Sequence, residues 1–168
     1  RVTGSDLLPR LCDWAAASGW RLGVVGGGER TVARVAEVVT GTHGASLAGH
    51  WLPHYRTSDP KLLRDIQLTD TIRSARADIL LVALGCPKQE LWLAENLSTS
   101  GAVVGIGIGA SLDFLVGAVT RAPGWIQTLR LEFLFRALLE PRRLISRYSS
   151  DFWFLLHMLA RKRHQGKR

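Results

Sequence analysis

The sequence predicts a doubly wound α/β fold, in which helices cover both faces of a mostly parallel β-sheet. Apolar runs of strand length alternate along the chain with segments of helical periodicity, the pattern of repeated βαβ units. One run, residues 79–84, is apolar at every position, as expected for a strand buried on both faces. With 46% hydrophobic and 21% charged residues, the 168-residue chain has the composition of one folded domain rather than of a disordered segment.

The individual elements follow from the spacing of apolar residues. Runs of strand length lie at residues 21–25, 45–51, 78–84 and 102–108. Between them apolar positions recur every three or four residues, as Val32, Val35 and Val39 do, which predicts helices. The helices are expected near residues 6–18, 29–40, 60–76 and 88–98. Together these elements predict a Rossmann-like core over residues 1–120.

A helical appendage is predicted after this core, over residues 121–168. One helix is expected at about 124–140, before a proline, and a second at about 142–161. The second helix has apolar residues along one face and Arg143 and Arg147 on the other. Its unbroken apolar stretch is far shorter than the roughly 20 residues of a membrane-spanning helix, so it is predicted to be a peripheral amphipathic helix.

The appendage carries the whole net charge of the chain. Residues 121–168 hold 11 basic and 3 acidic residues, whereas residues 1–120 hold 11 of each, so the excess of +8 lies in the tail. This asymmetry indicates a polyanionic partner, either a membrane surface or nucleic acid.

Neither a disulfide framework nor a metal site is predicted. Cys12 and Cys86 lie far apart and form no metal-binding spacing, which favours a reducing cytoplasm. His50 and His54 are four residues apart, but Pro53 between them makes a shared helical face unfavourable. The chain also lacks an Asp-x-Asp pair, the usual carboxylate ligands of a divalent ion in sugar-nucleotide enzymes. Catalysis without a metal ion is therefore expected.

A glycine-rich turn follows the first predicted strand, at the edge where open α/β sheets bind ligands. Gly26, Gly27 and Gly28 allow backbone N–H groups at the next helix start to approach a phosphate. The turn is neither a Walker A loop nor a GxGxxG motif, so a tight turn without a ligand is an equal alternative.

Residues 85–90 follow the third predicted strand and place Lys88, Gln89 and Glu90 at a helix start. A proline in this position is expected on structural grounds. A cation at the positive end of a helix is unfavourable unless an anion also binds. We therefore favour a functional site, which includes Gly85, over a solvated helix face.

Glycines alternate at the end of the fourth predicted strand, at Gly105, Gly107 and Gly109. Glycine weakens a strand interior, so a ligand or another backbone is expected to come close. Asp113, taken alone, is better explained as the cap of a turn. Arg121, before the appendage helix, can bind phosphate oxygens with two hydrogen bonds.

Four segments, in this order and spacing, closely resemble the WecG/TagA/CpsF family of bacterial glycosyltransferases. They are residues 84–90, 105–114 with Gly117, 121–125 and 140–143. The resemblance implies inverting transfer of an N-acetylhexosamine, typically N-acetylmannosamine, from a UDP-sugar to an undecaprenyl-diphosphate-linked sugar. Family members make wall teichoic acid, enterobacterial common antigen, capsule or other exopolysaccharide. They work on the inner face of the cell membrane, where a C-terminal appendage docks, in agreement with the basic tail.

Residue pattern and resemblance together define the candidate site. The catalytic candidates are Gln89, Lys88 and Arg143. The candidates for binding the UDP-sugar are Gly26, Gly27, Gly85, Glu90, Gly107, Gly109, Asp113, Arg121, Arg142 and Arg147. By the resemblance, Gln89 belongs to the donor-sugar or catalytic pocket and Asp113 to the nucleotide side. The arginines at 142, 143 and 147 would face the diphosphates and stabilise charge on the departing UDP, the task that a metal performs elsewhere. No cofactor is implied, because the UDP-sugar is a substrate.

The resemblance also predicts a preceding segment that carries the Asp thought to act as general base. The chain starts without an apolar leader and reads like the interior of a domain, so we expect it to be truncated. No residue here is assigned as the base. Asp6, in a stretch that matches the family, is interpreted as structural or acceptor-side.

Two other classes remain as alternatives. A nucleotide-binding Rossmann module such as an NAD-dependent oxidoreductase would need GxGxxG after the first strand and an acidic residue at the end of the next, and neither is present. A nucleic-acid-binding protein would use the basic tail and bind any duplex in a salt-sensitive way. The donor sugar, the acceptor, the polymer and the oligomeric state, including a homo-oligomer, stay open.

Overall fold

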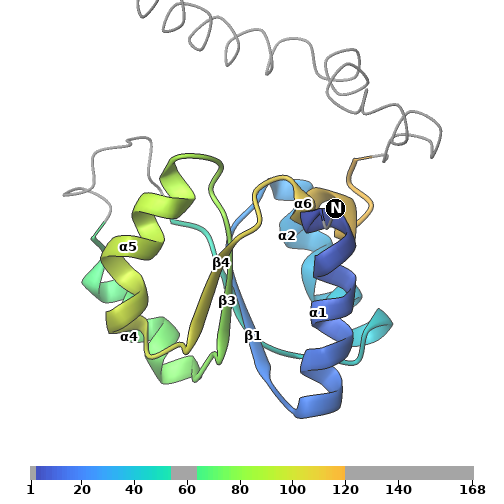
Figure 1. Ribbon diagram of the computed structural model, residues 1–168, viewed down its shortest axis with the longest axis horizontal. Coiled ribbons are helices and arrows are strands. Elements are labelled where there is room, and N and C mark those ends of the chain that lie inside the picture. Colours follow the sequence, from blue (N-terminus) through green and yellow to red (C-terminus); the bar gives the residue numbers. More distant parts are fainter. Residues whose placement is uncertain (1–2, 54–63, 120–168) are drawn as a thin grey trace, which may run out of the picture. The chain divides into compact units, whose positions relative to one another are not determined.

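The computed structural model describes residues 3–53 and 64–119 of the chain (Figure 1). These residues belong to the first of two units into which the chain divides, residues 1–120. The predicted appendage at residues 121–168 lies outside the described residues.

A four-stranded, entirely parallel sheet forms the centre of the described unit, with strand order β2-β1-β3-β4. The strands are β1 Arg21–Gly26, β2 Ser46–Trp51, β3 Ile79–Ala83 and β4 Val104–Gly107. All four lie within one residue of the predicted runs or inside them. The predicted doubly wound α/β fold is confirmed.

Helices cover both faces of this sheet (Figure 1). One face carries α1 Gly4–Ser18, α2 Glu29–Ala36, the π-helix η1 Glu37–Thr42 and α6 Ser111–Leu115. The other face carries α4 Ile66–Ala75 and α5 Lys88–Ser100. Helix α6 was not predicted, because five residues are too few to show helical periodicity. The predicted helix at residues 29–40 is α-helical to Ala36 and continues as a π-helix.

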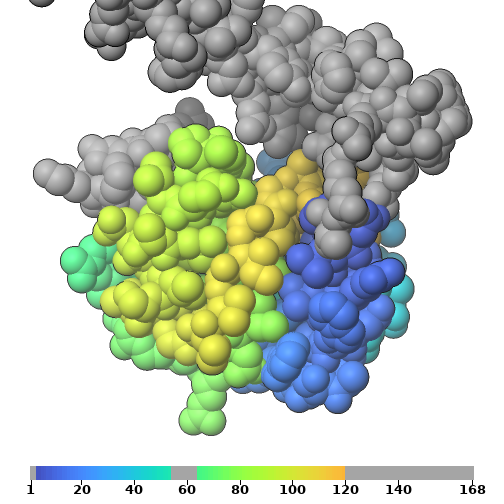
Figure 2. All heavy atoms as spheres, in the orientation of Figure 1, coloured from blue at the N-terminus to red at the C-terminus, as the bar shows by residue number. Residues whose placement is uncertain are grey.

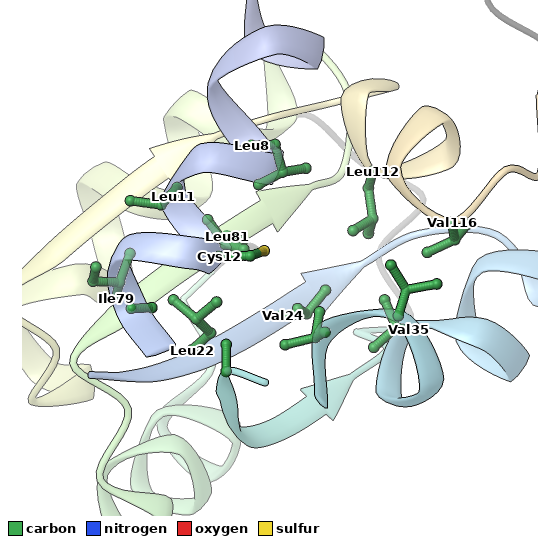
Figure 3. Close-up of a cluster of buried hydrophobic side chains, with 14 residues drawn as sticks. Leu8, Leu11, Cys12, Leu22, Val24, Val35, Ile79, Leu81, Leu112 and Val116 are labelled. Carbon is green, nitrogen blue, oxygen red and sulfur yellow. The ribbon is translucent and has the colours of Figure 1, made fainter. Parts of the chain in front are cut away.

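Two apolar cores lie on the two sides of the sheet. Successive side chains of a strand point to opposite faces, so Val24 belongs to one core and Val25 to the other. Figure 3 shows the first core, in which side chains of β1 and β3 meet those of α1, α2 and α6. The second core surrounds Trp92 of α5, whose side chain is fully buried. Burial on both faces explains why the third strand is apolar at every position.

The edge strand β4 is less covered than the other strands. Figure 2 shows it at the surface, between α5 and α1. Val103, just before the strand, is 80% exposed, and Val104 is 43% exposed. The sheet is therefore open to solvent on this side of the described unit.

The two cysteines should differ sharply in reactivity. Cys12 is fully buried in the first core, whereas Cys86 is exposed. Burial, and to a smaller extent the nearby Asp13 carboxylate, raises the pKa of Cys12 from 9.0 to about 11. Because the thiolate is the nucleophile, we expect iodoacetamide at pH 8 to modify only Cys86 in the folded protein and both cysteines after unfolding, as read by mass spectrometry.

The Cys86→Ser variant is the control and should stay unmodified until it unfolds. Equal labelling of both cysteines in the folded parent protein would contradict the burial of Cys12. Because the pKa of Cys12 is higher in the folded state, its contribution to stability is present below pH 9 and is lost as the pH rises toward 11.

Candidate active site

The winding direction of the sheet changes between β1 and β3. Strand β2 lies on one side of β1 and β3 on the other, and the helices that follow β1 and β3 cover opposite faces. In open α/β sheets, ligands bind at this point, beyond the carboxyl ends of the strands. The glycine turn after β1 and residues 85–90 after β3 therefore meet at one edge, as predicted.

The turn after β1 requires glycine for steric reasons. Gly26 and Gly27 have φ values of +89° and +103°, which residues with a side chain rarely adopt. A Cβ on Gly26 would also lie 2.8 Å from the carbonyl oxygen of Ala83. The Gly27 N–H donates a hydrogen bond of 3.2 Å to the same oxygen.

The tight-turn interpretation thus accounts for Gly26 and Gly27, and the Gly27 N–H is already occupied. Gly28, at φ −89°, is the N-cap of α2 and makes no side-chain cap. The first N–H groups of an α-helix have no partner within the helix. The N–H groups that can meet a phosphate are therefore those at the start of α2, and phosphate binding there stays a prediction.

The motif after β3 places Gln89 at this edge of the sheet, beyond the carboxyl ends of the strands. Its N–H donates to the carbonyl of Gly85 at 2.9 Å, so the turn and the first residues of α5 form one unit. The Gln89 side chain is only 8% exposed, and its Nε2 donates to Glu90 Oε1 at 2.8 Å. Its Oε1 is buried and has no hydrogen-bond partner among the residues that the structure describes. Such an oxygen costs about 1–3 kcal/mol in a folded protein, which favours a functional role.

The glycines in β4 and just after it make room for side chains of α5. A Cβ on Gly107 would lie 2.8 Å from Gln89 Nε2, and one on Gly109 would lie 3.4 Å from Gln89 Oε1. A Cβ on Gly105 would collide with Leu93. At Gly105 and Gly107 the close neighbours are side chains of α5, so packing alone accounts for the missing side chains of these two glycines. Contact of Gly107 and Gly109 with a ligand as well stays a prediction.

Asp113 links α6 to α2, the helix that follows the glycine turn. Its Oδ1 accepts a hydrogen bond of 2.6 Å from the Thr31 hydroxyl, across 82 positions of sequence. Thr31 is 1% exposed, and a Cβ on Gly27 would lie 3.2 Å from its methyl group. The N-cap of α6 is Ala110 and the cap has no side-chain hydrogen bond, so the Asp113 side chain does not cap this helix. Sequence reasoning missed Thr31, because nothing local distinguishes it from other helix threonines.

His50 is a second residue that sequence reasoning did not place at this edge. It lies near the carboxyl end of β2, and its Nε2 makes a hydrogen bond of 2.7 Å with the Gly26 carbonyl oxygen. His54, its partner in the rejected metal pair, lies outside the described residues. In the described ranges, no group of three or more His, Cys, Asp or Glu side chains could hold a metal ion.

The other candidates fall into two sets. Lys88 is the first residue of α5 and is half-buried, and Glu90 is exposed beside Gln89. The arginine candidates all lie outside the described residues, so their assignments stay predictions: Arg121, Arg142, Arg143 and Arg147. Asp6 lies in the first turn of α1 and accepts a hydrogen bond of 2.6 Å from Thr3 Oγ1.

Two findings concern the class of protein. Within the described ranges, every helix is too short or too polar to cross a membrane. Comparison with known families shows that residues 1–168, the whole chain, match the model of the glycosyl transferase WecG/TagA/CpsF family.

Proposed function

The chain belongs to the WecG/TagA/CpsF family of glycosyltransferases, and on this premise we propose that it transfers an N-acetylhexosamine from a UDP-sugar to an undecaprenyl-diphosphate-linked sugar. N-acetylmannosamine is the first candidate for the transferred sugar. Family membership favours glycosyl transfer over the oxidoreductase and nucleic-acid alternatives. The observation that supports the placement of the reaction is the buried Gln89 carboxamide, with its unpartnered oxygen, at the edge where β1 and β3 diverge.

The proposed reaction is a single inverting displacement. The acceptor hydroxyl oxygen attacks the anomeric carbon, the bond from that carbon to the UDP oxygen breaks, and a base takes the hydroxyl proton. No described residue is assigned as this base. The Gln89 Oε1 can accept a hydrogen bond from the donor sugar, which would orient the anomeric carbon for attack.

We propose that the donor diphosphate is held by N–H groups and cations without a metal ion. The N–H groups at the start of α2 form the positive end of the helix dipole. There they would stabilise the negative charge that grows on the departing UDP. Arg142, Arg143 and Arg147 would add positive charge against the departing UDP. The chain contains no Asp-x-Asp pair, which agrees with this arrangement.

The acceptor is proposed to be reached at the inner face of the cell membrane. The excess charge of +8 lies in residues 121–168. Each Lys or Arg near an anionic leaflet contributes about 1 kcal/mol, so several together are sufficient for reversible peripheral binding.

The function is tested by calorimetry with UDP and UDP-N-acetylmannosamine, followed by a transfer assay on a short-chain lipid-diphosphate acceptor. We expect UDP to bind equally well with and without EDTA, and ADP to bind more weakly. Transfer that EDTA abolishes and manganese restores would contradict the metal-free mechanism. A chain that does not bind UDP, or that prefers ADP or NAD, would contradict the proposed donor.

A further inference from the structure

The peptide group between Gly26 and Gly27 is held from both sides. Its carbonyl oxygen accepts a hydrogen bond from His50 of β2, and its N–H donates to Ala83 at the end of β3. Both neighbouring strands therefore contribute one hydrogen bond to the same peptide group.

This peptide group would otherwise be free to rotate. It is flanked by two glycines at positive φ, and glycine has few steric barriers to a change of backbone conformation. A change of ψ at Gly26 that is not compensated by φ at Gly27 would redirect Gly28 and the first N–H groups of α2, which follow directly in the chain. The two hydrogen bonds are the interactions that keep the peptide group in the observed orientation.

The position of His50 and its ring nitrogens are suited to holding this peptide group. Trp51 packs in the second core, so the neighbouring His50 points to the opposite face, on which α2 lies. A carbonyl oxygen only accepts hydrogen bonds, so Nε2 carries the hydrogen. The other ring nitrogen, Nδ1, is buried without a hydrogen-bond partner among the described residues. A buried polar atom without a partner destabilises the folded state, so the gain in stability from the His50 ring is reduced by this cost.

We propose that His50 is a positioning residue for the donor: by holding the Gly26–Gly27 peptide group, it fixes the direction in which the start of α2 presents its N–H groups to the diphosphate. This inference rests on the proposed function, in which that diphosphate belongs to a UDP-sugar. His50 itself need not touch the donor.

The experiment compares two substitutions. His50→Phe keeps a ring of similar shape but removes the donor, whereas His50→Gln keeps an N–H donor at similar reach. We expect His50→Phe to raise the Kd for UDP about threefold to tenfold, the range for one hydrogen bond, and His50→Gln to stay within about twofold. The melting temperatures of both variants should lie close to that of the parent protein. In His50→Phe, removal of the unpaired Nδ1 offsets the loss of the hydrogen bond.

A second readout does not depend on UDP. Amide hydrogen exchange of Gly27, measured by NMR, should be faster in His50→Phe than in the parent, while Val25 in β1 keeps its protection. The matched control is His43→Phe, because His43 lies before the first residue of β2 rather than at its carboxyl end, and pairs with Asp13 at 2.8 Å. This control should leave both UDP binding and Gly27 exchange unchanged.

The outcomes distinguish a failure of the positioning role of His50 from a failure of the proposed function on which it rests. If the parent binds UDP but His50→Phe binds as tightly, or if His50→Gln loses as much affinity as His50→Phe, the positioning role is wrong. Unchanged Gly27 exchange in His50→Phe would also overturn it. A parent protein that does not bind UDP overturns the proposed function and, with it, the link to the diphosphate.

Discussion

The Gly107→Ala variant should lose about 100-fold in kcat/KM for transfer while keeping nearly the stability of the parent protein. The new Cβ would lie 2.8 Å from Gln89 Nε2 and 3.1 Å from its Cδ, so the carboxamide has to move. The atoms in the way belong to the end of a flexible side chain, so the fold adjusts at low cost. A displacement of about 1 Å in a group that orients the substrate can cost about 100-fold in rate.

A double-mutant cycle identifies the cause of this loss. If Gly107→Ala acts through Gln89, then adding it to Gln89→Ala should cost nothing further, because the displaced side chain is already gone. The control is Gly41→Ala, in η1, where a Cβ meets nothing within 4 Å. Additive losses in the double variant would show that Gly107 affects transfer independently of Gln89. Full activity of Gly107→Ala would show that Gln89 has no part in the reaction.

The Gly26→Ala variant should be destabilised by about 3 kcal/mol, which combines the cost of a side chain at positive φ with that of overpacking. Gly26 has φ +89°, and its Cβ would lie 2.8 Å from the backbone oxygen of Ala83. This atom belongs to β3 and cannot move without disturbing the pairing of the two central strands. The change is measured as the free energy of unfolding in urea.

The neighbouring Gly28 provides a matched control. Its φ is −89°, and a Cβ there meets nothing within 4 Å. Gly28→Ala should therefore stay within about 1 kcal/mol of the parent, because the reduced freedom of the unfolded chain offsets the lower preference of Ala for this N-cap position. If both variants are equally stable, the steric explanation of the glycine turn is wrong.

The sequence alone determined the strands and longer helices, and it pointed to residues 85–90. Strand β3 could be predicted because a strand buried on both faces is apolar throughout, and α5 because a proline and a change of periodicity mark its start. These signals are local: each depends on residues within about one element. The family resemblance was carried by the same kind of short segments and is confirmed over the whole chain.

Only the tertiary structure decided which residues meet at the site. Thr31 and Asp113 are 82 positions apart, and His50 lies 24 positions from Gly26. Their contacts depend on the order β2-β1-β3-β4, which places the ends of β2 and β3 on either side of β1. Strand order depends on which strands pair with each other across long stretches of sequence, and this pairing leaves no local pattern in the sequence. For the same reason Gly107 looked like an opening for a ligand, although the side chain of Gln89 lies against it.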